Sequence, residues 1–185
     1  MSLTVGRDII LENTRFLFCY AVSGGAVYVN TGSRLFARSL TVENCSATLH
    51  GGGIFLNASS MTMEGASMFR GNAANNRGGA VYAISAVSVT LGDVVLFERN
   101  AVLSTAGSVA PYGGAFFASL AIVTVPVGST LTFFANSCVY RGGAMVLSQV
   151  TLDVGGEINF VGATLFCTAS PALHTPEFFP PESLF

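Results

Sequence analysis

The stretch Gly78-Gly79-Ala80-Val81-Tyr82-Ala83 decides the fold of this chain, because four other segments repeat its pattern. Each copy is a glycine pair, a small residue and then an apolar run. The copies begin at Gly24, Gly51, Gly78, Gly113 and Gly142, so successive starts lie 27, 27, 35 and 29 residues apart. Self-similarity at such a period indicates a repeat architecture, in which each unit buries its apolar face by stacking on its neighbours.

Each repeat contains three short segments of the kind that form β-strands. In the third copy they span residues 80–83, 87–91 and 94–97, and the middle one alternates apolar and polar side chains. No stretch between them has a helical apolar period with caps, so each strand is expected to pair with its equivalent one repeat later. We therefore predict an all-β fold, a right-handed parallel β-helix (solenoid) of about five to six coils with three short strands per coil. A β-propeller is disfavoured because each blade needs about 40 residues and four strands.

The repeats define the domain organisation. We predict a single β-helix domain over residues 1–167, with repeats starting near 24, 51, 78, 113 and 142 and a partial N-terminal coil at 1–23. Residues 168–185 form a Pro-rich tail or cap that breaks the pattern. An insertion at 101–112 lengthens one coil and is expected to protrude as a loop, a common place for binding in repeat proteins.

A second motif, Phe-x-x-Asn, ends the third strand of a repeat. Its members are Phe69 and Asn72, Phe97 and Asn100, and Phe133 and Asn136, with Phe160 continuing the phenylalanine column. We expect the rings to point inward and stack, and the asparagines to occupy a corner and form a side-chain ladder. The first glycines of the pairs, Gly24, Gly51, Gly78, Gly113 and Gly142, supply the other corner, where a positive φ or a close backbone approach excludes a Cβ.

Together the two motifs resemble the repeats of the chlamydial polymorphic outer membrane proteins, over roughly residues 11–162. In that family the β-helical repeats form the passenger of an autotransporter, displayed outside the cell and implicated in adhesion. The resemblance implies a secreted or surface-displayed, non-enzymatic module that acts as an adhesin or a structural spacer. It also implies an extracellular or cell-surface location within a longer surface protein, with a host-cell or glycan ligand or self-association as the interaction.

Composition limits the other functions. The chain of 185 residues is 51% hydrophobic and only 10% charged, with a net charge of −2, so it offers no basic field for nucleic acid. The apolar run at 118–127 contains β-branched residues and Pro126 and falls into register with the other repeats, so we predict no transmembrane segment. No Cys-x-x-Cys or paired histidines are present, and we predict neither a metal site nor a cofactor.

The first strand of each repeat supplies the candidate binding site. Alternation places Val81 and Ala83 in the core and Tyr82 between them on the outside. The equivalent outward residues form an aromatic stripe of Tyr28, Phe55, Tyr82 and Phe117. If exposed, such a stripe is typical of a contact surface for a glycan, a partner strand or a second copy. The alternative is that the stacked rings stabilise the sheet or lie under a loop.

The four cysteines suggest two disulfides between adjacent coils. Cys19 and Cys45 precede consecutive glycine pairs by similar distances, and Cys138 and Cys167 fall in successive coils. A coil spacing near 4.8 Å lies within the Cα separation of a disulfide, about 4.4–6.8 Å. Such bonds would indicate an oxidising compartment. The alternative is four buried free thiols.

Carbohydrate-cleaving enzymes often use this fold, so a glycoside hydrolase or polysaccharide lyase, or an inactive relative, is the rival hypothesis. Such enzymes need paired or clustered carboxylates. The acids here are scattered: Asp93 and Asp153 are expected two coils, about 10 Å or more, apart. Arg70 and Glu98 align one coil apart as a surface ion pair. We therefore predict that no residue is catalytic and that the protein is not an enzyme.

Overall fold

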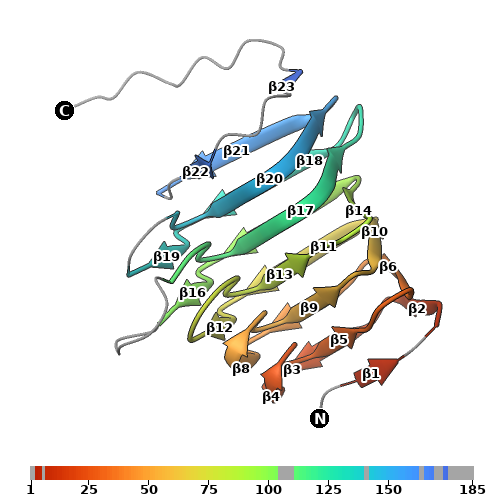
Figure 1. Cartoon of the computed structure of the whole chain (residues 1–185), viewed down its shortest axis with the longest axis vertical. Helices are drawn as coiled ribbons and strands as arrows, with labels where there is room; N and C mark the ends of the chain where they lie inside the picture. Colours follow the sequence, from red (N-terminus) through yellow and green to blue (C-terminus); the bar gives the residue numbers. More distant parts are fainter. Residues whose placement is uncertain are drawn as a thin grey trace.

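The structure is a computed structural model that describes residues 3–5, 7–103, 111–139, 142–162, 165–168 and 173–174, with side chains for 7–103, 111–139 and 142–162. Parallel strands stack one above another from the N-terminal coil to the blue C-terminal strands (Figure 1). None of the described residues is helical, and so none forms a helix that could cross a membrane. The fold is a parallel β-solenoid of about 5 turns, which confirms the predicted fold class.

The strands form three sheets of 12, 6 and 5 members, here named sheets A, B and C. Sheet A holds the first and second strands of each coil, and its members are β1 (Leu3–Val5), β2 (Ile9–Glu12), β5 (Val27–Val29), β6 (Arg34–Arg38), β9 (Ile54–Asn57), β10 (Ser60–Glu64), β13 (Val81–Ile84), β14 (Ser88–Leu91), β17 (Phe116–Val125), β20 (Met145–Val154), β22 (Leu165–Thr168) and β23 (Leu173–His174). Sheet B comprises β3 (Arg15–Leu17), β7 (Thr41–Glu43), β11 (Ala66–Arg70), β15 (Val94–Glu98), β18 (Thr130–Phe134) and β21 (Glu157–Val161). Sheet C comprises β4 (Tyr20–Ser23), β8 (Ser46–His50), β12 (Ala73–Ala74), β16 (Ala101–Val102) and β19 (Ser137–Cys138).

Each strand pairs in parallel with its equivalent one coil later, as the repeat predicts. In the third coil, for example, Val81 is the partner of Ile54 on one side and of Phe116 on the other. Sheet C, whose strands precede the glycine pairs, was not predicted from the sequence. In the coils of β17 and β20, the first and second strands fuse into single 10-residue strands that bend through the sheet.

The core is a continuous column of stacked side chains along the solenoid axis. Phe69, Phe97 and Phe133 are fully buried, and successive ring centroids lie 4.9 and 5.0 Å apart. Phe160 extends the stack with a centroid separation of 5.2 Å from Phe133. The predicted inward phenylalanine column is confirmed, because the register places equivalent residues directly above one another.

The asparagine ladder is also confirmed. Asn72 Nδ2 donates to Asn100 Oδ1, and Asn100 Nδ2 donates to Asn136 Oδ1, each at 3.0 Å. The same amide nitrogens donate to main-chain carbonyl oxygens of the preceding coil, at Val42 and Phe69 respectively. All three asparagines are buried, and each buried polar atom in such a ladder needs its partner to offset desolvation.

The glycine pairs form the other corner, for two separate reasons. The first glycines, Gly24, Gly51, Gly78, Gly113 and Gly142, all have φ between 61° and 67°, which confirms the predicted positive φ. The second glycine is needed for close stacking instead. A Cβ on Gly79, for example, would collide with the carbonyl oxygen of Gly114 in the next coil. The pair therefore turns the chain and lets two coils approach at once.

Two predicted features lie largely outside the described residues. Of the insertion at 101–112, the structure describes 101–103 and 111–112, so the predicted protruding loop stays a prediction. Of the tail at 168–185, it describes only Thr168 and the strand β23.

Candidate functional site

The predicted aromatic stripe faces away from the main core, as alternation requires, but it is not exposed. Phe55, Tyr82 and Phe117 are 9%, 3% and 4% accessible, and Tyr28 at the end of the row is half-buried. Their rings stack in register, with centroids 4.8 to 5.1 Å apart. They form a second, smaller apolar cluster on the outer side of sheet A, together with Val146.

A column of residues that lies where sheet C meets the glycine pairs covers this cluster. His50, Arg77 and Tyr112 immediately precede glycine pairs and align on adjacent coils. The His50 ring stacks on Tyr82 with centroids 4.5 Å apart, and the Arg77 guanidinium lies 5.2 Å from the centre of the Phe117 ring. We name His50, Arg77 and Tyr112 the covering column. His50 and Arg77 each reach over the aromatic residue one coil further on, and the Tyr112 ring lies 6.5 Å from that of Phe117 on the strand that follows it.

The exposed-stripe prediction is therefore wrong, and the alternative that the rings stabilise the sheet is correct. The physical reason is the glycine corner. The tight turn folds the residue before the glycine pair back across the next strand of sheet A. An aromatic ladder under such a cover contributes packing rather than a contact surface.

The covering column has its own electrostatic character. Partial burial lowers the pKa of His50 below its ordinary value of 6.5, and the nearby positive charge of Arg77 lowers it further. Within the described residues, His50 Nδ1, Asn76 Oδ1 and Arg77 Nε are buried without a hydrogen-bond partner. The imidazole is thus held neutral beside a cation that rests on aromatic rings.

The described cysteines form no disulfide, contrary to the prediction. Cys19 and Cys45 do occupy one column on adjacent coils, but both are free thiols, and Cys45 Sγ accepts a hydrogen bond from the Cys19 amide at 3.4 Å. Burial raises the pKa of the Cys45 thiol to about 11. Cys138 is also free, and it lies in sheet C, whereas Cys167 lies in sheet A opposite Leu147. The predicted Cys138–Cys167 pairing is therefore wrong, because the two strands belong to different sheets; the Cys167 side chain is outside the described residues.

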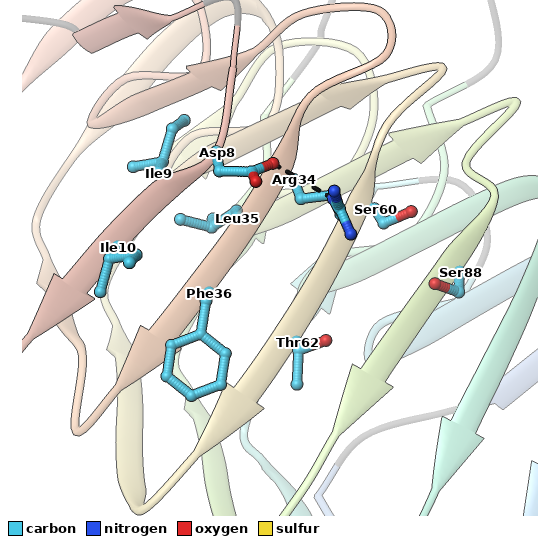
Figure 2. Close-up of a pocket in the computed structure, with 9 residues that line it drawn as sticks. All are labelled: Asp8, Ile9, Ile10, Arg34, Leu35, Phe36, Ser60, Thr62 and Ser88. Atoms are coloured by element: carbon cyan, nitrogen blue, oxygen red, sulfur yellow. Dashed lines mark hydrogen bonds and ion pairs between the residues drawn. The ribbon is translucent and has the colours of Figure 1, made fainter.

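An open groove lies elsewhere on sheet A, over its second strands. It has a volume of about 360 Å³ and crosses β2, β6, β10 and β14. Its outward-facing side chains fall into two rows that follow the register of these strands. One row is Ile10, Phe36 and Thr62, and the other is Arg34, Ser60 and Ser88 (Figure 2).

One end of the groove carries charge and the middle carries an aromatic ring. Arg34 Nε donates to Asp8 Oδ1 at 3.1 Å, and both side chains are largely exposed. Figure 2 shows this pair beside Leu35 at one end, with the Phe36 ring further along the same strand and Thr62 on the next strand. The groove thus combines an aromatic surface, a guanidinium, a carboxylate and three hydroxyl groups.

Sequence reasoning missed this groove. The signal was present in Arg34-Leu35-Phe36-Ala37-Arg38, which alternates charged or aromatic residues with aliphatic ones. Alternation assigns Arg34, Phe36 and Arg38 to the outside. Nothing local distinguishes this outward face from that of the first strands, which the covering column shields.

The acids considered for the enzyme hypothesis do not meet in the groove. The Asp93 carboxylate accepts a hydrogen bond from the Gly65 amide, and the Asp93 amide donates to Ser129 Oγ, so this residue holds a turn. Asp153 aligns with Thr124 on a coil further along. Arg70 and Glu98 form the predicted ion pair, with Arg70 Nε 2.8 Å from Glu98 Oε2. Among the groove-lining residues, Asp8 is the single carboxylate.

Comparisons with known proteins leave the family open. No protein-family model matches this chain, and no significant match was found among curated proteins or among solved structures.

Proposed function

We propose that this chain is a non-enzymatic β-solenoid module, secreted or displayed at a cell surface, that binds a glycan in the groove over the second strands of sheet A. The observation that carries the proposal is the composition of the groove. An aromatic ring beside an ion pair and hydroxyl groups suits a sugar, which presents an apolar ring face and many hydroxyls at once. The repeat resemblance to polymorphic outer membrane proteins supports display and adhesion.

The roles of the groove residues follow from their positions. Phe36 offers the surface on which a sugar ring packs. Arg34 donates and Asp8 accepts hydrogen bonds, and charge-assisted hydrogen bonds are the stronger kind. Ser60, Thr62 and Ser88 can each donate and accept, and Ser88 lies one coil beyond Ser60, which extends the site along the solenoid. An extended site of this kind favours an oligosaccharide over a monosaccharide.

The test is a binding screen of the intact chain against a panel of neutral and acidic oligosaccharides. For the glycans that bind, we expect Phe36→Ala and Arg34→Gln each to weaken affinity at least about tenfold, equivalent to about 1.4 kcal/mol. Phe134→Ala and Arg15→Gln are matched controls. Phe134 is a half-exposed ring on sheet B, and Arg15 makes an exposed inter-coil ion pair with Glu43 at 2.8 Å.

Three results would contradict the proposal. Binding that survives both groove substitutions would place the ligand elsewhere. Absence of binding to the whole panel would favour a structural spacer. Release of reducing ends or unsaturated products during incubation, lost on Asp8→Asn, would support the carbohydrate-active enzyme instead.

A further inference from the structure

The row of the groove that contains Phe36 and Thr62 (Figure 2) continues beyond the groove, toward the later coils. Thr62 aligns with Thr90 on β14, and Thr90 aligns with Thr124 on β17. All three threonines are partly exposed on the outer face of sheet A. Successive coils lie about 4.8 Å apart, so this row presents one threonine at each step of that length.

The neighbouring row also carries hydroxyl groups on two of these coils. Ser60 aligns with Ser88. On β17 the next place in this row falls to Ile122, whose side chain is 49% exposed. The face therefore starts at the Phe36 ring, crosses two coils with a hydroxyl in each row, and reaches the apolar side chain of Ile122. These two apolar side chains lie three coils apart, about 14 Å.

The hydroxyl groups of this face take no part in holding the fold together. They have no hydrogen-bond partner within the described part of the chain, and they belong to Ser60, Thr62, Ser88, Thr90 and Thr124. The side chains that alternate with them on these strands are fully buried: Met61, Val89 and Val123. A packed core thus holds the strands in place while their outward hydroxyls stay available to a ligand at fixed spacing.

The face has little charge to offer. Arg34 is already paired with Asp8 at 3.1 Å. From Ser60 to Thr124, neither row contains an ionisable side chain. The row on the side of sheet B has one more negative than positive charge, and it consists of Glu12, Arg38 and Glu64. An anionic polymer would therefore find no net electrostatic attraction along this face.

The arrangement of the rows gives a ligand its direction. β14 spans only Ser88–Leu91, with Ser88 and Thr90 on the outside. A ligand that followed one strand would leave the hydroxyl face after two side chains. A ligand that crossed the strands would meet a similar pair of side chains on each successive coil. The face therefore suits an extended ligand that lies along the solenoid axis.

We infer, on the proposed function that the groove binds a glycan, that its ligand is a neutral, unbranched polysaccharide that lies along the solenoid axis from Phe36 to Ile122. Thr90 and Thr124 are then further binding residues beyond the groove. Sugars joined through equatorial bonds form an extended ribbon with apolar ring faces and hydroxyl edges. Such a ribbon packs its ring faces on Phe36 and Ile122 and forms hydrogen bonds with the hydroxyl rows between them.

The test is calorimetric titration of the intact chain with neutral oligosaccharides of graded length, the cello-, xylo- and manno-oligosaccharides. We expect affinity to rise with length until the oligomer spans from Phe36 to Ile122, and then to level off. Thr90→Val and Thr124→Val should each weaken binding of the longest oligomers about threefold or more, the effect of losing one neutral hydrogen bond, and leave the disaccharides unaffected. Phe36→Ala should weaken binding at every length.

Matched controls separate this inference from the proposed function. Thr132→Val changes a partly exposed threonine on sheet B and should leave every affinity unchanged. Oligomannuronates carry a carboxylate on each sugar and should bind more weakly than manno-oligosaccharides of equal length.

Three results would overturn the inference while Phe36-dependent binding still supported a glycan site. They are equal affinity for a disaccharide and the longest oligomer, equal loss of short and long oligomers in Thr124→Val, and tighter binding of the oligomannuronates. Failure of all these series to bind would overturn it too, and the wider glycan panel would then decide whether the proposed function also fails.

Discussion

Sheet A presents two outward faces, and one is covered while the other is open. Over the first strands, the ladder that contains Tyr82 is buried beneath the covering column. Over the second strands, the row that contains Phe36 lines an open groove. Both rows alternate with core residues, and both belong to one continuous sheet, since β17 and β20 run through both halves.

The difference comes from the corners at the two ends of sheet A. The glycine pair brings sheet C sharply against the first strands, so the residue before the pair lies across their outer face. At the other end, the turn into sheet B carries residues such as Gly65 and Asp93, whose hydrogen bonds join the same corner on adjacent coils. The glycine corner therefore packs side chains over the first strands, and the corner into sheet B leaves the second strands open to a ligand.

The largest expected effect comes from breaking the covered corner. Gly79→Ala should destabilise the protein by more than about 3 kcal/mol, because the added Cβ meets the Gly114 carbonyl oxygen and the coils must separate. Gly128→Ala, at the turn into sheet B, adds a Cβ with no atom within 4 Å, so only its φ of 78° opposes the change. We expect a loss of about 1 kcal/mol there. Urea unfolding of both variants measures the contrast, and equal losses would show that the glycine pair is not a stacking requirement.

The fold could be predicted from the sequence because its signals repeat. The glycine pair and Phe-x-x-Asn each recur once per coil, and register then places Phe97 above Phe69 and Asn100 above Asn72. The site could not be predicted in the same way. Alternation separates inward from outward side chains, but it does not say whether another segment covers an outward one. His50 and Arg77 act through a turn, on rings five residues further along the chain or one coil away.

The second largest effect is expected from truncating one aromatic residue on each outward face of sheet A, Tyr82 on the covered face and Phe36 in the groove. Tyr82→Ala should cost about 3 kcal/mol of unfolding free energy, because a buried ring stacked between Phe55 and Phe117 is removed. Phe36→Ala should cost less than about 1 kcal/mol, because its ring lies on the groove surface. Glycan binding should respond in the opposite order, with Tyr82→Ala largely neutral at temperatures where it is folded. Chemical denaturation measures the loss of stability in the two variants, and calorimetric titration measures their glycan affinity. A reversal of either order would contradict the assignment of Tyr82 to packing and Phe36 to binding.

The smallest effect is a pH dependence confined to the covered face. Because burial and Arg77 lower the pKa of His50 in the folded state, the unfolded chain takes up this proton first as the pH falls. Stability should therefore decline as the pH falls below about 6.5 and level off once the folded imidazole is also protonated. His50→Phe keeps a ring against Tyr82 and should lose this part of the decline, whereas Phe36→Ala should keep it. Melting temperatures between pH 7.5 and 5 would measure it, and the same slope in wild type and His50→Phe would mean that the covering imidazole is not held neutral.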